Sequence, residues 1–247
     1  MRGVRRLLLV ALVAALVGAV APGSAQAETG RSAGAVALVT GKVTVTRLQG
    51  TPRPLRLHDT LHWHDVIDTG KGSTARILLD GKTTVTLREL SRVELRGEAV
   101  ADGVRYVVDL AAGKVRMSVA RMLMRPGDQV EVRTRNAVAS VRGTDFIVET
   151  VERPDPASAF GVLELRQVAH GVLGAATRSD ETRVITLSGT VEVTSRLAPP
   201  GQAERVSAHE ALQVGMRHDP TRLQIEPAAL RGLLEGLTPP RPEVIPE

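Results

Sequence analysis

The chain has 247 residues, a formal net charge of +5, no cysteine and only four aromatic residues. The lack of cysteine excludes disulfide bonds, and the shortage of aromatic rings argues against glycan-binding faces and single-stranded nucleic-acid grooves, which stack their ligands on such rings. Three of the 32 basic residues lie in an N-terminal segment that we expect to be removed. The remaining 29 face 27 acidic residues, so the charge does not indicate nucleic-acid binding.

The N-terminus has the three parts of a secretory signal peptide. Three arginines precede an apolar run from Leu7 to Val20, and an Ala-x-Ala pattern ends at Ala27. The run is shorter than the ~20 residues that span a bilayer. We predict a signal peptide over residues 1–27, cleavage near Ala27, and a periplasmic or secreted protein without a transmembrane segment after cleavage. An uncleaved anchor is the alternative.

The first half of the mature chain is predicted to form short antiparallel strands. Residues 75–79 and 83–87 indicate a hairpin, because the Asp80-Gly81 pair suits the positive φ angles of a two-residue turn. Residues 121–128 are predicted to form a loop with some exposed apolar side chains. The other expected strand segments are 35–47, 55–67, 93–96, 105–110 and 114–119.

Residues 130–149 are the most informative stretch. The alternation of apolar and charged residues predicts two strands and the start of a third, and Gly143 shifts the phase as a bulge or tight bend does. Because the second strand has small or apolar residues on both sides, including Val138, we expect a central strand that is buried on both faces.

The last third of the chain is predicted to form further strands, and after them a helix and an extended tail. Residues 153–158 look like a break, and strands are expected at 163–172, 182–195 and 205–214. An amphipathic helix follows, because Leu230, Leu233, Leu234 and Leu237 form one apolar stripe. This helix either docks on the protein's own core or on a partner. A Pro-rich extended tail ends the chain.

An apolar–Gly–x–Val pattern recurs three times, at Gly41, Gly113 and Gly189. The spacing of more than 70 residues is too long for a solenoid repeat and favours a strand–turn–strand device at sheet corners.

These elements predict an all-β fold, a sandwich or rolled sheet of short antiparallel strands with one short C-terminal α-helix. In chain order, we expect a signal peptide at 1–27, a β domain at 35–151, a β-strand continuation on the same fold at 152–220, and the helix with its tail at 221–247.

Four spaced segments carry a family resemblance. Residues 65–73 and 79–81, then 112–116, and then 132–146 (Val-Arg-Thr-x-x-Ala-Val-x-x-Val-Arg-Gly-Thr-x-Phe) resemble FecR-type domains in the family's order. His64 stands where the family usually has glycine. The motif residues that we single out from this resemblance are Gly70, Gly81, Gly113, Gly143, Thr144 and Phe146.

The resemblance implies an exported, non-catalytic module that recognises an envelope protein or relays a signal. In known regulators of the family, a cytoplasmic sigma-binding region is followed by a membrane span and then by a FecR domain. Here the predicted signal peptide stands in place of the first two parts. A cell-wall polysaccharide- or peptidoglycan-binding module is the alternative function. A metal-dependent β-barrel enzyme is a third.

The stretch from Lys114 to Arg142 contains seven basic and two acidic residues. It predicts one of two surfaces: a basic patch that binds a protein or an anionic polymer, or a solvated face without a ligand. The residues we single out as ligand- or partner-binding are Arg116, Arg133, Arg135 and Arg142.

Arg142 has two interpretations. If its strand is buried, the guanidinium requires an acidic partner, such as Asp145, Glu149 or Asp109. Otherwise it forms a carboxylate site with the backbone amides of Gly143 and Thr144.

His62 and His64 are weak metal-ligand candidates, because they would share one face of a strand. A metal site needs further ligands from elsewhere, so surface histidines are the favoured interpretation. No nucleophile, phosphate-loop or dinucleotide motif is present. We therefore expect no enzyme activity and no cofactor.

Overall fold

The computed structural model describes residues 32–48, 50–154, 178–197, 199, 202–215 and 220–225, and only the backbone of 152–154 and 178–180. Strands and one short 3-10 turn, Arg121–Leu123 (η1), make up the regular structure of this part. None of its helices is long and apolar enough to cross a membrane. The all-β prediction is confirmed for the described residues, whereas the predicted C-terminal helix and the strand at 163–172 lie outside them.

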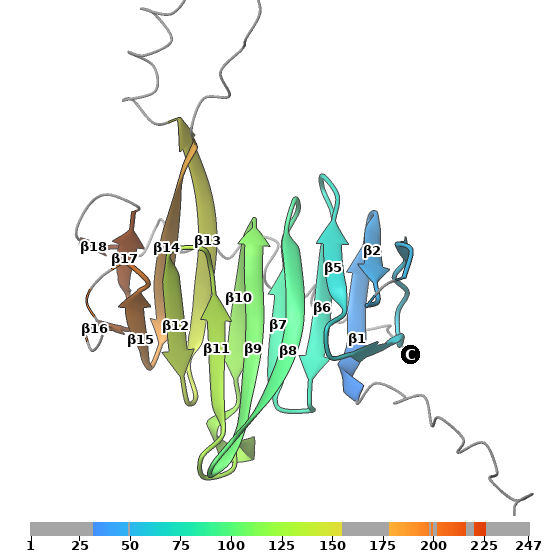
Figure 1. Ribbon diagram of the computed structural model, residues 1–247, viewed down its shortest axis with the longest axis horizontal. Helices are drawn as coiled ribbons and strands as arrows, with labels where there is room; N and C mark the ends of the chain where they lie inside the picture. Colours follow the sequence, from blue (N-terminus) through green and yellow to red (C-terminus); the bar gives the residue numbers. More distant parts are fainter. Residues whose placement is uncertain are drawn as a thin grey trace, which may run out of the picture. The chain divides into compact units, whose positions relative to one another are not determined.

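The strands form two nine-stranded sheets (Figure 1). Sheet A contains, in order across the sheet, β18 (Thr221–Gln224), β17 (Glu210–Val214), β14 (Arg178–Ser188), β13 (Asp145–Pro154), β10 (Lys114–Val119), β7 (Thr83–Leu87), β6 (Thr74–Leu79), β1 (Ser32–Thr40) and β4 (Thr60–His62). Sheet B contains β16 (Ala203–Ser207), β15 (Thr190–Ser195), β12 (Ala137–Val141), β11 (Gln129–Arg133), β9 (Gly103–Ala112), β8 (Arg92–Val100), β5 (Val66–Thr69), β2 (Val43–Thr46) and β3 (Arg53–Pro54).

The chain builds both sheets together by alternating between them. The hairpin β6–β7 lies in sheet A, β8–β9 in sheet B, and the same alternation continues through β11–β12, β13–β14, β15–β16 and β17–β18. The predicted Asp80-Gly81 turn joins β6 to β7, with φ angles of 47° and 67°. Pairing is antiparallel except between β9 and β11, which are parallel because β10 crosses to sheet A between them.

Glycines lie where the chain passes from one sheet to the other. Gly41 separates β1 from β2, Gly113 separates β9 from β10, and Gly189 separates β14 from β15, with φ angles of 77°, 92° and 81°. Such angles are strained for residues with a Cβ atom. A Cβ at Gly113 would also lie 2.5 Å from the Cα of Ser91. The prediction of a repeated corner device is confirmed.

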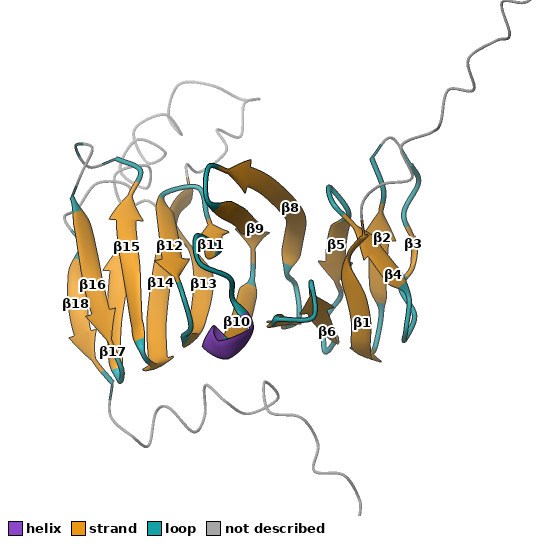
Figure 2. Ribbon diagram, turned by 90° about the horizontal axis from the view of Figure 1, so that it is seen from below, coloured by secondary structure: helices purple, strands orange, loops and turns teal. Residues whose placement is uncertain are grey.

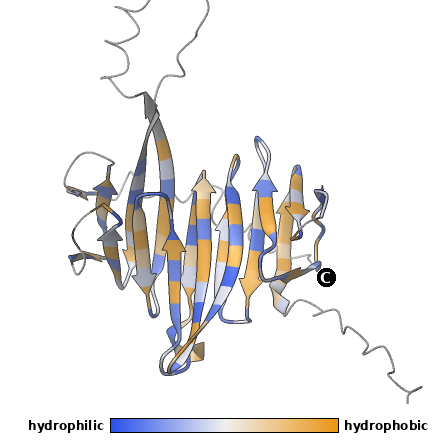
Figure 3. Ribbon diagram, in the orientation of Figure 1, coloured by the Kyte–Doolittle hydropathy of each residue, from blue (hydrophilic) through white to orange (hydrophobic). Residues whose placement is uncertain are grey.

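The two sheets enclose an aliphatic core (Figure 2). Buried and less buried residues alternate along most strands, and Figure 3 shows the same alternation as bands of hydropathy. In β12, Ala137, Ala139 and Val141 face this core, but Val138 is only half-buried. The expectation that this strand is buried on both faces was therefore wrong. The strand is an internal strand of sheet B, but among the described elements sheet A covers only one of its faces.

A polar clasp joins the β11–β12 turn of sheet B to sheet A. The fully buried Asn136 donates a 2.7 Å hydrogen bond to the carbonyl of Val214 on β17 and accepts one from the Thr182 hydroxyl on β14. The hydroxyls of Thr134 and Thr182 lie 2.7 Å apart. Buried polar groups need such partners, so this cluster fixes the turn against the opposite sheet.

Candidate partner-binding groove

The outer face of sheet B carries opposite charges that pair with one another. Arg133 on β11 donates to both carboxylate oxygens of Glu98 on β8, over 2.8 and 3.0 Å, and to Glu131 over 2.8 Å. Arg105 on β9 lies 2.9 Å from Glu131 and 3.4 Å from Glu98. The hydrogen bonds from Arg133 lead the effects that hold the pKa of Glu98 below its usual range. Arg133, one of the predicted binding residues, is thus engaged in a closed four-membered ion network.

Arg142 differs from most of the charged side chains on this face. It follows directly after β12, it is exposed, and it has no ion pair with any described residue. The remaining charged pairs on the face are Arg92 with Asp68, His64 with Glu94, Arg96 with Asp109, and Arg205 with Glu192. Arg142 therefore keeps a guanidinium without an acidic partner among the described residues, as do the exposed Lys42, Arg121 and Arg125.

Arg142 is exposed, so the first of its two interpretations, a buried guanidinium with an internal acidic partner, is wrong. Asp145 instead binds Arg116, with nitrogen–oxygen distances of 2.6 and 2.9 Å. Glu149 binds Lys114 at 3.0 Å, and Asp109 pairs with Arg96. Asp145 and Glu149 lie on β13 in sheet A, across the sheet crossing at Gly143.

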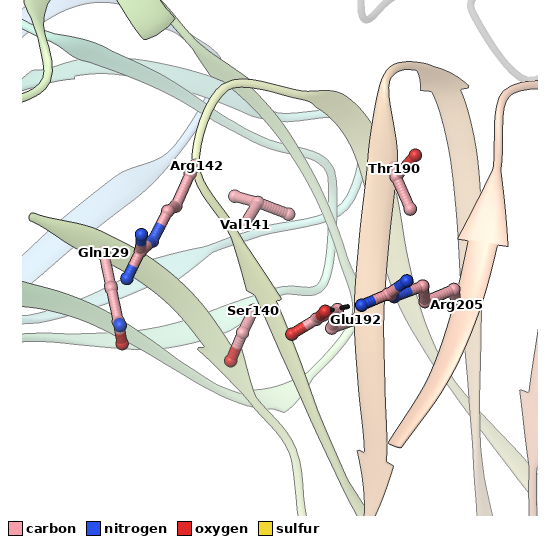
Figure 4. A pocket seen from close by; sticks show the side chains of 7 residues that line it. All are labelled: Gln129, Ser140, Val141, Arg142, Thr190, Glu192 and Arg205. Carbon is pink, nitrogen blue, oxygen red and sulfur yellow. Dashed lines mark hydrogen bonds and ion pairs between the residues drawn. The ribbon is translucent and has the colours of Figure 1, made fainter.

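A groove of about 580 Å³ opens beside Arg142 on sheet B (Figure 4). Its walls come from four neighbouring strands and are lined by Gln129, Ser140, Val141, Arg142, Thr190, Glu192 and Arg205. Ser140 on β12 is directly opposite Glu192 on β15, which in turn is opposite Arg205 on β16. Figure 4 shows Arg142 on the Gln129 side of Ser140, and the Glu192–Arg205 pair on the other side.

The groove offers hydrogen-bond donors at one end and a mixed charge at the other. The Arg142 guanidinium, the Gln129 amide and the Ser140 hydroxyl all donate, and a guanidinium binds carboxylates in bidentate geometry. Glu192 and Arg205 lie 3.3 Å apart and are both exposed. Such an exposed pair holds together weakly, so both side chains are able to re-pair with a ligand. This arrangement suits a polypeptide with an acidic group better than a uniformly anionic polymer.

The four predicted binding arginines do not form one surface. Arg116 projects from β10 on the outer face of sheet A, whereas Arg133 and Arg142 belong to sheet B. Arg135 is exposed in the β11–β12 turn. The basic stretch is therefore divided between opposite sides of the sandwich, and only Arg142 lines the groove.

The resemblance motif lies mainly where the chain turns or crosses. Gly81 occupies the β6–β7 turn, Gly70 and Gly143 connect strands of sheet B to strands of sheet A, and Phe146 is fully buried in the core. Thr144 is also buried, and its hydroxyl donates to the Thr190 carbonyl over 2.9 Å. Neither Gly143 nor Thr144 lines the groove beside Arg142.

The two histidines do not share a strand face. His62 ends β4, whereas His64 lies in the following turn with a φ angle of 69°. The His62 ring lies 2.9 Å from a guanidinium nitrogen of Arg47, and that of His64 lies 3.2 Å from Glu94. In the part of the chain that the structure describes, no three potential ligand side chains come together in a way that could hold a metal.

The groove residues other than Arg142 were not predicted. Gln129, Ser140, Thr190, Glu192 and Arg205 are ordinary outward-facing strand residues. Alternation identifies their face, but it does not reveal which strands are neighbours. These residues come together only through the pairing register of neighbouring strands in sheet B.

Comparison with known proteins identifies the family. The model of the family described as FecR protein matches residues 65–192, slightly more than half of the chain. A search of curated proteins found no significant match. The family is non-catalytic, in agreement with the expectation that the protein is not an enzyme.

Two crystal structures of a protein described as a putative anti-sigma factor from Parabacteroides distasonis ATCC 8503, at 1.65 and 2.50 Å resolution, show partial structural similarity. Each has 19% sequence identity, a TM-score of 0.47, and an alignment that covers 69% of this chain. The alignments cover 65% and 64% of those chains, so this chain spans less than two thirds of their length. By its match over residues 65–192, the chain belongs to the FecR protein family.

Proposed function

We propose that the protein is exported to the cell envelope, is cleaved near Ala27, and acts there as a non-catalytic signal-relay module. It recognises a protein partner through the groove on sheet B, with Arg142 as the anchoring residue. Export is supported by the signal-peptide pattern of residues 1–27. Partner recognition is supported by membership of the FecR family and by the chemistry of the groove.

The observation that carries the proposal is the exposed guanidinium of Arg142, which lines the groove and has no ion pair with any described residue. A hydrogen bond to a charged group contributes about 1.5–3 kcal/mol. Arginine is also one of the residue types that dominate binding energy at protein interfaces. A carboxylate on the partner, from an acidic side chain or a chain terminus, supplies the matching group.

A protein ligand fits the groove better than a cell-wall polymer. Glycan sites present exposed aromatic rings. In the described residues, Tyr106 and Phe146 are buried, and Trp63 packs against Tyr106 with ring centroids 6.1 Å apart. The acidic Glu192 also opposes a uniformly anionic polymer at one end of the groove.

Site-specific photo-crosslinking in the cell tests this proposal. A photoreactive residue replaces Thr190, whose exposed side chain lines the groove, and the attached species is identified by mass spectrometry. Attachment of one envelope protein is the expected result. Attachment of cell-wall fragments alone would transfer the function to polymer binding, and no attachment would remove the groove as the binding surface.

A further inference from the structure

The outer face of sheet A contains a row of buried apolar residues. Ile147 on β13 is opposite Ile185 on β14, which is opposite Ala211 on β17. Phe146 and Val148 flank Ile147 in the strand and face the core between the sheets, so Ile147 faces away from that core. Nevertheless, Ile147 is 0% exposed, and Ile185 and Ala211 are each 1% exposed.

Several outward-facing positions elsewhere on sheet A are polar, although Leu78 on β6 is an exposed apolar residue. The polar positions include Arg76, Thr84 and Arg116, which is directly opposite Ile147 on the next strand. An apolar row in such a face requires another segment to cover it, because exposed apolar patches are unfavourable. Among the described apolar residues outside the row, Leu187 and Ile225 pack against it.

Ile225 is the last described residue, and because it packs against the row, the chain that follows starts beside the row. Its amide hydrogen bonds over 3.3 Å to the carbonyl of His209, just before β17. The next residues, 226–237, are the predicted amphipathic helix with its stripe of Leu230, Leu233, Leu234 and Leu237. A twelve-residue helix is roughly 18 Å long. The row across three strands, with its extension to β18, spans roughly 14 Å.

The two other long segments outside the described residues join the sheet farther away. Residues 155–177 leave from Pro154 and return at Arg178, each seven residues along its strand from the row, or roughly 23 Å. Residues 1–31 join at Ser32 on β1, four strands from β13, or roughly 19 Å across the sheet.

We propose that residues 226–237 form a helix that docks within the same molecule on the outer face of sheet A, with its leucine stripe against Ile147, Ile185, Leu187 and Ala211. The helix belongs to the fold of the mature protein. It lies on the sheet opposite to the one that carries the groove, so this inference is independent of the proposed partner.

The absence of cysteine permits a direct test in the mature full-length protein. The pair Leu187→Cys/Leu234→Cys places one thiol beside the row and one on the stripe. The matched control Leu187→Cys/Glu235→Cys moves the second thiol to the opposite face of the expected helix. A second control, Thr84→Cys/Leu234→Cys, moves the first thiol to a distant strand of the same outer face. Disulfides form only between closely spaced residues.

We expect the first pair to give an intramolecular disulfide in about tenfold higher yield than either control at low protein concentration. Equal yields in all three pairs would overturn the proposal, and so would a disulfide that joins two molecules, which would assign the row to a second copy. Because each variant keeps the whole chain, its circular dichroism spectrum shows separately whether it folds.

Discussion

The ammonium nitrogen of Lys82, in the β6–β7 turn of sheet A, lies 3.2 Å from a carboxylate oxygen of Asp128, which precedes β11 in sheet B. The two side chains are only 16% and 2% exposed. Asp128 also accepts hydrogen bonds from the amides of Val104 and Arg125, and Lys82 contacts the Tyr106 hydroxyl at 3.1 Å. This pair ties the two sheets together at one end, as Asn136 does elsewhere.

Removal of the Lys82 charge should therefore destabilise the protein strongly. Lys82→Met leaves the carboxylate of Asp128 buried without its ammonium partner, and loss of one partner of a buried pair costs about 3 kcal/mol or more. The control Arg92→Met removes the exposed partner of Asp68, and an exposed pair contributes less than about 1 kcal/mol. Urea unfolding measures both, and equal effects would show that the Lys82–Asp128 pair does not hold the sheets together.

The same cluster predicts a dependence of stability on pH. Burial raises the pKa of Asp128, but the Val104 and Arg125 amides and the Lys82 ammonium outweigh burial and lower it below its ordinary value of 3.8. A lowered folded-state pKa stabilises the protein above the unfolded-state pKa, and this contribution disappears as pH falls through the folded-state pKa. Between pH about 5 and about 2, the wild type should lose more free energy of unfolding than Asp128→Asn. Parallel pH curves would contradict this prediction.

The crossing at Gly143 should not tolerate a side chain. Its φ angle is 133°, and a Cβ atom there would lie 2.4 Å from the Cβ of Arg121. Gly72 is a matched control, because it also has positive φ (64°) but has nothing within 4 Å of the added atom. Gly72→Ala should cost about 1 kcal/mol through backbone strain alone. Gly143→Ala should cost at least about 2 kcal/mol more, and unfolding free energies within error of each other would rule out the predicted clash.

Cleavage of the N-terminal segment is directly measurable. Intact-mass analysis of the protein recovered from the cell envelope or the medium should give a chain that begins at Glu28. Ala27→Arg disrupts the small-residue pattern and should leave the precursor uncleaved. A wild-type protein that retains Met1 in the envelope would instead indicate an uncleaved anchor.

The sequence predicted the fold class and many local devices because these depend on neighbouring residues. Alternation of apolar residues located the strands, and the Asp80-Gly81 pair predicted its hairpin. The three crossing glycines were recognisable because a corner between sheets needs positive φ. Whether the strands form a sandwich or one rolled sheet remained open, because the choice depends on contacts between distant segments.

The groove was harder to predict, and Arg142 shows why. The apolar or small residues on both sides of β12 suggested burial of both faces, yet no described element of sheet A covers Val138 or Arg142. Arg116 and Arg133 appeared to belong to one basic surface, but β10 and β11 lie in different sheets. Ser140, Glu192 and Arg205 meet only through strand register, which local sequence does not determine.

The central claim is that Arg142 anchors a protein partner in the groove. The most direct measurement is the yield of the photo-crosslinked partner at position 190 in wild type, Arg142→Ala, Arg142→Lys and the control Arg92→Ala, which removes a paired arginine three strands away on the same face. We expect at least about a tenfold loss for Arg142→Ala, a partial loss for Arg142→Lys because lysine lacks the bidentate geometry, and no loss for Arg92→Ala. An unchanged yield in Arg142→Ala, with the protein folded, would contradict the account.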